Sequence, residues 1–198
     1  MNWTEKNRLG MALFVLSEAV FFLLLIFAWV YFRAGWNETP VAGVLKPAVS
    51  KVHDVIAALA PSRMGGFSVA LLTSSLTMWR AEVSARRNRK WKLRMWLFAT
   101  IALGCTFVYG QATEFMNLLS RHITISLNTF GSTFFTMTGF HGMHVIAGLI
   151  LLTTLFGFAW TGEAEQHSTA VDTIAIYWHF VDLVWVGIFT AVYLWTLS

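Results

Sequence analysis

The sequence predicts an all-helical membrane protein that crosses the bilayer five times, and three observations favour this fold class. Hydrophobic residues make up 57% of the 198 residues, charged residues only 12%, and the mean hydropathy is +0.61. Soluble domains typically carry about 25% charged residues, so charge is depleted about twofold. Leu9 to Phe32 includes a single charged residue, Glu18, and is long enough to cross a hydrocarbon core about 30 Å thick. Lipid offers the backbone no hydrogen-bonding partner, so each span must be helical.

The remaining spans follow from the other apolar runs. We expect spans at about residues 8–33, 62–78, 94–117, 128–160 and 172–195, within a single transmembrane domain that covers residues 1–198. The first and second spans are separated by a segment that holds all three prolines. Cys105 lies among apolar neighbours in the third span and is expected to be a small buried side chain.

The distribution of basic residues predicts the orientation. Seven of the fourteen Lys and Arg residues lie between Arg80 and Arg94, in the connection between the second and third spans. Connections rich in Lys and Arg stay on the cytoplasmic side, so we expect the N-terminus inside and the C-terminus outside. The net charge of +4 therefore reflects membrane topology and does not indicate a nucleic-acid partner.

Five ionisable side chains fall well inside the expected spans, away from their ends: Glu18 in the first, His141 and His144 in the fourth, and His179 and Asp182 in the fifth. Such a group costs about 2.5–3.5 kcal/mol at the centre of a span, so each needs a partner or a function. Their depths predict one buried polar network. A carboxyl group in apolar surroundings can bind and release a proton, which makes Glu18 a candidate for proton handling. The simpler alternative is that all five groups only hold the helices together.

The histidines also admit a sharper interpretation. Two histidines at i and i+3 lie on one helix face, and His141 or His144 together with His179 has the arrangement of two axial haem ligands. Other residues are candidates for lipid or subunit contact: Glu114, Arg89, Lys90, Trp178 and Trp185.

Three segments carry a family likeness. Residues 132–146 read STFFTMTGFHGMHVI, residues 177–185 read YWHFVDLVW, and residues 16–22 read LSEAVFF. These segments resemble subunit III of the haem–copper oxidases, the cytochrome c oxidase and quinol oxidase family, and they occur in the family's order.

The resemblance implies a short bacterial member with five helices, located in the cytoplasmic membrane. It implies a non-catalytic subunit of a proton-pumping terminal oxidase that supports the stability and proton uptake of subunit I and binds lipid. It implies no metal or haem in this chain, because haem and copper belong to partner subunits. The implied partners are subunits I and II, a small subunit IV and phospholipids. The family's buried glutamate matches Glu18, and its histidine and aspartate signatures match His141, His144, His179 and Asp182.

Three other functions stay open on the sequence. One is an accessory subunit of a complex of the nitric-oxide-reductase type. Another is an independent proton or ion transporter built on Glu18 and the histidines, although the sequence has no inverted repeat. The third is a b-type cytochrome that uses His141 or His144 with His179.

Overall fold

The computed structural model describes residues 3–34, 61–120, 129–161 and 168–194, and these residues are helical apart from one tight turn. The elements are α1 (Trp3–Ala34), α3 (Pro61–Arg86), α4 (Lys90–Ser120), α5 (Thr129–Thr161) and α6 (Ser168–Phe189), which continues into the π-helical turn η3 (Thr190–Leu194). Each expected span lies almost entirely within the helical segment at its position, so the predicted all-helical class is confirmed for the described residues.

The connection between α3 and α4 is a tight turn, and it lies later in the chain than the expected end of the second span. The second span was expected to end at Met78, but α3 continues for about two more turns to Arg86. Two residues after the end of α3, Asn88 has a φ of 52°, which lies in the left-handed region that asparagine tolerates. The Arg89 amide donates to the Ser84 carbonyl at 2.9 Å, and the Asn88 amide donates to the Ala85 carbonyl at 3.0 Å. These two bonds form a Schellman motif, which stops the helix abruptly.

Four helical segments are long and apolar enough to cross a membrane: Leu9–Tyr31, Lys90–Ser120, Ser132–Thr161 and Thr169–Tyr193. Helix α3 is also long enough, because its 26 residues extend about 39 Å. It is less apolar than the other four helices because serine and threonine side chains interrupt its apolar surface. The second expected span, which lies in α3, therefore stays a prediction, and so does the total of five spans.

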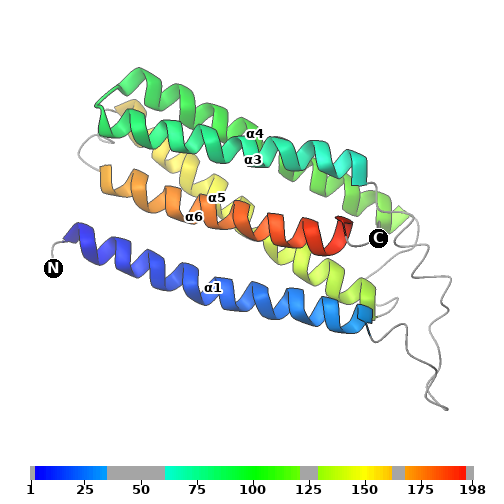
Figure 1. Cartoon of the computed structure of the whole chain (residues 1–198). Coiled ribbons are helices and arrows are strands. Elements are labelled where there is room, and N and C mark those ends of the chain that lie inside the picture. The colour runs from blue at the N-terminus through cyan, green and yellow to red at the C-terminus, as the bar shows by residue number, and fades with distance from the viewer. Residues whose placement is uncertain (1–2, 35–60, 121–128, 162–167, 195–198) are drawn as a thin grey trace, which may run out of the picture.

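The helices form a bundle in which successive elements run in opposite directions (Figure 1). Helices α3 and α4 lie side by side along their length, and α6 packs against α1, α3 and α5. The N-terminal end of α1 and the α3–α4 turn lie at one end of the bundle, while α6 ends at the other. Which side of the membrane each end faces stays a prediction.

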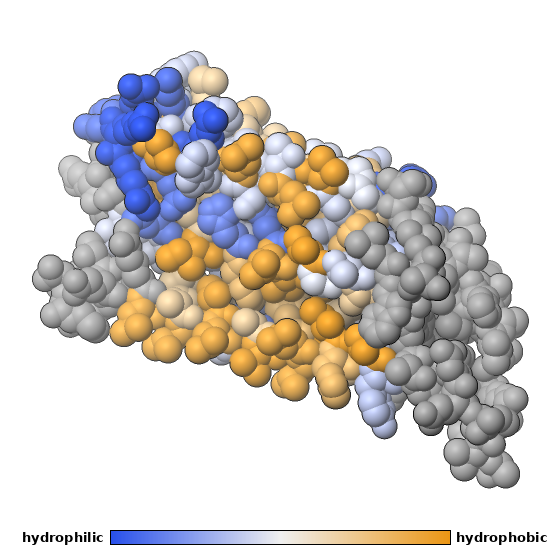
Figure 2. Space-filling model, in the orientation of Figure 1, coloured by the Kyte–Doolittle hydropathy of each residue, from blue (hydrophilic) through white to orange (hydrophobic). Residues whose placement is uncertain are grey.

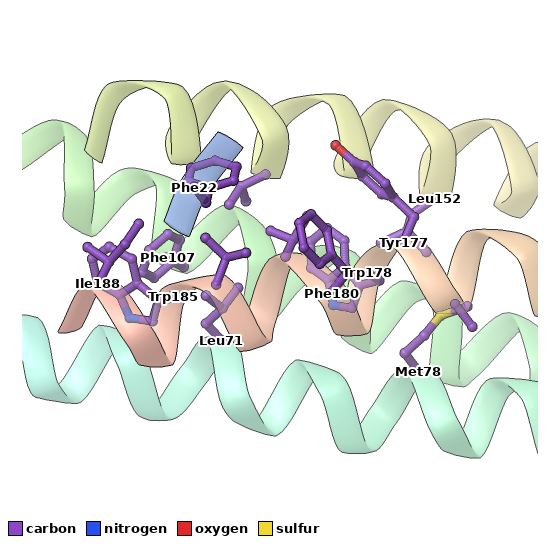
Figure 3. Packing of buried hydrophobic residues seen from close by; sticks show 14 of the residues in the cluster. Phe22, Leu71, Met78, Phe107, Leu152, Tyr177, Trp178, Phe180, Trp185 and Ile188 are labelled. Carbon is purple, nitrogen blue, oxygen red and sulfur yellow. The ribbon is translucent and has the colours of Figure 1, made fainter. Parts of the chain in front are cut away.

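The core is centred on α6. Trp178, Trp185 and Ile188 of this helix are at most 1% exposed, and Figure 3 shows them among side chains from the other four helices. Among residues 9–31 of α1, whose burial is described, two side chains are fully covered, Phe22 and Trp29, and the outer surface of this helix is mostly apolar (Figure 2). Cys105 of α4 is exposed, so its predicted burial is wrong.

Candidate functional site

Glu18 of α1 and His144 of α5 form a pair inside the bundle. The Glu18 Oε2 atom lies 3.1 Å from His144 Nε2, and both side chains are largely covered, with 23% and 17% of their surface exposed. The ring of Phe22 packs edge-on against His144 with centroids 5.1 Å apart. The Tyr177 hydroxyl donates to the His144 carbonyl at 3.0 Å, which ties α6 to the same place.

The second ring nitrogen of His144 determines how many protons this pair holds. Nδ1 lies 2.8 Å from the Phe140 carbonyl oxygen. A carbonyl can only accept a hydrogen bond, so Nδ1 must carry a hydrogen. The contact between Nε2 and Glu18 Oε2 then needs one further proton, which resides either on the carboxyl group or on the imidazole. The pair is thus a single-proton site whose proton can sit on either partner.

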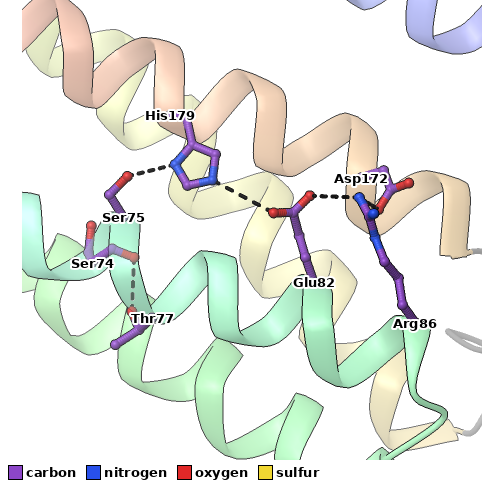
Figure 4. Close-up of polar contacts among 7 residues, drawn as sticks. All are labelled: Ser74, Ser75, Thr77, Glu82, Arg86, Asp172 and His179. Atoms are coloured by element: carbon purple, nitrogen blue, oxygen red, sulfur yellow. Dashed lines mark hydrogen bonds and ion pairs between the residues drawn. The ribbon is translucent and has the colours of Figure 1, made fainter.

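His179 belongs to a different polar group, which joins α6 to α3 (Figure 4). Its Nδ1 lies 2.6 Å from the Ser75 hydroxyl, and its Nε2 lies 3.8 Å from Glu82 Oε2. Arg86 continues the group, at 3.7 Å from Glu82 and 3.3 Å from Asp172 at the start of α6. This group lines the α3–α6 contact from the middle of the helices towards the α3–α4 turn.

The sequence interpretation missed Glu82 and Asp172. Two signals were available: Glu82 and Arg86 stand at i and i+4, the spacing of helical ion pairs, and Asp172 stands at the predicted start of the fifth span. They were overlooked because α3 was expected to end before Glu82.

His141 and Asp182 lie in the core without hydrogen-bond partners among the described residues. The His141 ring is fully buried and stacks on Trp185, with centroids 5.0 Å apart and planes 25° apart. Phe107 packs against it edge-on at 5.8 Å. Aromatic rings therefore surround His141 where a haem ligand would need a facing histidine. Asp182 is 3% exposed, and both of its carboxylate oxygens are covered.

The structure thus separates the five residues that were expected to form one network. Glu18 and His144 meet at the contact of α1 with α5, whereas His179 meets residues of α3. The reason is the central position of α6, which lies between α1 and α3 in the bundle (Figure 1). His179 of α6 consequently faces Ser75 and Glu82 of α3 and is separated from the Glu18–His144 pair.

The two tryptophans that were expected at lipid or subunit contacts are interior residues. The Trp178 indole N–H donates to Ser74 Oγ at 2.9 Å, and the Trp185 indole N–H donates to Ser68 Oγ at 2.9 Å. Both rings are covered by this chain's own helices, so they do not face lipid or a partner. They lock α6 to the serine-bearing face of α3.

Of the remaining candidates, Glu114 is buried in α4. Arg89 and Lys90 are exposed at the α3–α4 turn. Within the described ranges, no three His, Cys, Asp or Glu side chains are grouped so that they could hold a metal ion.

The model of the family described as cytochrome c oxidase subunit III matches residues 2–197. The chain belongs to this family. Its relatives include cytochrome c oxidase subunit 3 of Lumbricus terrestris, which is 33% identical over 97% of this chain and 71% of its own length. A probable cytochrome c oxidase subunit 3 of Nocardia farcinica is 32% identical over 98% of this chain and 90% of its own length. The cytochrome c oxidase subunit 3 of Synechocystis is 31% identical over 96% of this chain and 76% of its own length.

Membership of the subunit III family confirms the resemblance carried by residues 16–22, 132–146 and 177–185. Together with the four long apolar helices, it makes the chain a multi-pass membrane protein of an oxidase family. The Glu18–His144 pair joins the first of these motifs to the second, and the Tyr177 hydroxyl adds the third. The three segments that identify the family are therefore in contact in the folded chain.

Proposed function

We propose that this chain is the non-catalytic subunit III of a proton-pumping haem–copper terminal oxidase in a bacterial cytoplasmic membrane. The observation that carries the proposal is the family match over residues 2–197. Oxygen reduction belongs to partner subunits that hold the haem and copper, and this chain carries no redox centre. The partners are subunits I and II, a small subunit IV and phospholipids.

The orientation forms part of the same proposal. The α3–α4 turn and the N-terminus face the cytoplasm. Helix α3 crosses the membrane as the second span, which gives five spans in total. Two observations support α3 in this role: it lies alongside α4 over its length, and its serine hydroxyls meet α6 inside the bundle. The basic turn then lies where cytoplasmic connections carry their positive charge.

The Glu18–His144 pair supports a contribution to proton uptake by subunit I. It holds one proton in a largely covered position where that proton can reside on either partner. Movement of that proton between the carboxyl group and the imidazole leaves the pair neutral overall, so the transfer creates no net charge in an apolar environment. His141, His179 and Asp182 contribute to the packing of the bundle around this pair.

The proposal is tested by purifying the tagged chain in mild detergent and identifying what accompanies it by mass spectrometry. We expect a large haem-bearing subunit and a second subunit that carries a copper site or a quinol-oxidase counterpart, together with a haem absorbance spectrum. A chain that is recovered intact and alone from cells respiring oxygen would contradict the proposal. Neighbours with nitric-oxide-reducing activity would assign the chain to that complex instead.

Replacing Glu18 by glutamine is expected to leave assembly intact and to impair proton-coupled turnover. Glutamine keeps the shape and can still hydrogen-bond His144, and interhelical polar contacts in membranes average only about 0.6 kcal/mol. It cannot release a proton, so the oxidase containing Glu18→Gln should lose activity after fewer turnovers. The measurement is oxygen consumption over time and across pH, with subunit composition determined on the same sample.

The matched control is Ser17→Ala, because Ser17 is the adjacent polar residue, is exposed and bonds only to its own helix at the Phe14 carbonyl. This variant should behave as wild type. If the oxidase containing Glu18→Gln has the same turnover lifetime and pH profile as the control, Glu18 serves packing alone.

A further inference from the structure

The α3–α4 turn contains a hollow that the proposed function leaves unexplained. It is a cavity of about 360 Å³ at the end of the two helices. Its lining combines four cations with two indole rings: Arg80, Arg87, Arg89, Lys92, Trp91 and Trp96. The same end of the molecule is the most hydrophilic part of the surface in Figure 2.

The cations that line this hollow lack a counter-charge among the described residues. In the described part of the structure, none of the four lies within ion-pair distance of a carboxylate. Other basic residues of the same region behave differently. Arg86 pairs with Glu82 and Asp172, and Arg94 donates to the Ala159 carbonyl at 2.9 Å at the end of α5. Four like charges gathered without a counter-charge repel one another and favour an anion in the hollow.

The positions of these cations are fixed by the local fold. The Schellman motif at Asn88 holds the backbone that carries Arg87 and Arg89. The Arg80 guanidinium lies over the rings of Trp79 and Trp96, at 5.6 and 5.7 Å from their centroids. The first turn of α4 begins at Lys90, and the N-terminal end of a helix adds partial positive charge. The hollow is thus formed before a ligand arrives.

An apolar stripe leads away from the hollow along α4. Its exposed members follow one another at helical spacing: Trp91, Met95, Phe98, Ala102, Cys105 and Tyr109. Spacings of three and four residues keep all six on one face of the helix. A ligand seated in the hollow therefore meets positive charge at one end and a continuous hydrophobic track at the other. Indole rings at such a boundary are typical of the membrane interface.

We propose that this hollow binds the phosphate-bearing headgroup of an anionic phospholipid, with its acyl chains along the α4 stripe. The proposal specifies the phospholipid contact of the proposed function and rests on the membrane orientation given there. A soluble anion would use the cations alone, whereas a phospholipid uses the cations and the stripe together. This combination favours phospholipid as the occupant.

The test is native mass spectrometry of the tagged complex after titration with phosphatidylglycerol or phosphatidylcholine. Wild type should retain phosphatidylglycerol in preference. Each Lys or Arg near a lipid surface contributes about fivefold in affinity, so Arg87→Gln with Lys92→Gln should weaken retention roughly 25-fold. The effect of a single charge is measured by comparing Arg87→Gln with Arg63→Gln. Arg63→Gln is the matched control, because Arg63 is exposed near the opposite end of α3.

Several results would overturn the site. These are equal retention of the two lipids by wild type, equal losses for Arg63→Gln and Arg87→Gln, displacement of the lipid by inorganic phosphate, and displacement by an acidic peptide. Subunit composition is read from the same spectra. Lipid retained by a chain without oxidase partners would support the site and contradict the proposed function, so the two failures are distinguishable.

Discussion

Replacing Trp178 by alanine is expected to lower the free energy of unfolding by about 3–5 kcal/mol and the melting temperature by roughly 10 °C. The indole is fully buried and joins four helices at once. It belongs to α6, packs against Gly104 of α4 and Gly148 of α5, and donates to Ser74 of α3. Its removal leaves a cavity that no single helix can close by moving. The measurement is thermal unfolding of the purified protein in detergent.

The conservative variant Trp178→Phe separates packing from hydrogen bonding. It keeps most of the ring and loses the N–H, so we expect a loss of about 1 kcal/mol. Ser74 is not stranded by this change, because its hydroxyl also donates to the Leu71 carbonyl at 2.6 Å. Equal stability of Trp178→Ala and wild type would show that this contact does not organise the bundle.

Replacing Gly148 by valine is expected to destabilise the bundle by about 1–3 kcal/mol, the usual range for overpacking a filled core. A Cβ atom at this position would lie 2.8 Å from the Trp178 ring and 3.2 Å from the Tyr177 ring. Trp178 cannot withdraw, because the other side of its ring lies against Gly104 of α4, where an added Cβ would lie 2.9 Å from it. The melting temperature in detergent and the yield of assembled complex both report the effect.

Gly157→Val is the matched control for this substitution. Gly157 lies in the same helix, is exposed, and would have no atom within 4 Å of an added Cβ. Both variants carry the same intrinsic penalty of valine in a helix, so their difference isolates the contact with Trp178. If the two variants melt at the same temperature, close approach of α5 to α6 is not needed.

The sequence predicts the helices and much of the site, because both depend on local pattern. Apolar run length places every span within a helix, and the cost of burying charge correctly requires a partner for Glu18. Which partner it finds could not be predicted, since it depends on how each helix is rotated about its axis. Glycines and tryptophans set that rotation: the Trp178 ring fits only where Gly104 and Gly148 leave room. This fit between a tryptophan and two glycines involves residues far apart in the chain, so it produces no periodic pattern in the sequence.

The α3–α4 boundary shows a second limit. Hydropathy alone ended the second span at Met78, because polar residues follow. The helix instead ends where Asn88 can adopt a left-handed conformation, which places Glu82 and Arg86 on the helix and beside α6. The single expected network failed for a related reason, since hydropathy does not reveal that α6 separates α1 from α3.

The hydroxyl groups of α3 have a consequence for biogenesis. Most of those that interrupt its apolar surface donate to carbonyls of the same helix: Ser68 to Met64, Thr73 to Val69, Ser74 to Leu71, Thr77 to Ser74 and Ser84 to Arg80. These bonds are local, so they form as soon as the helix does and reduce the penalty for leaving water. During synthesis α3 emerges long before α6, so these local bonds are in place before the last helix is made. The serine oxygens keep a free acceptor site, which the two indoles of α6 occupy when the last helix arrives.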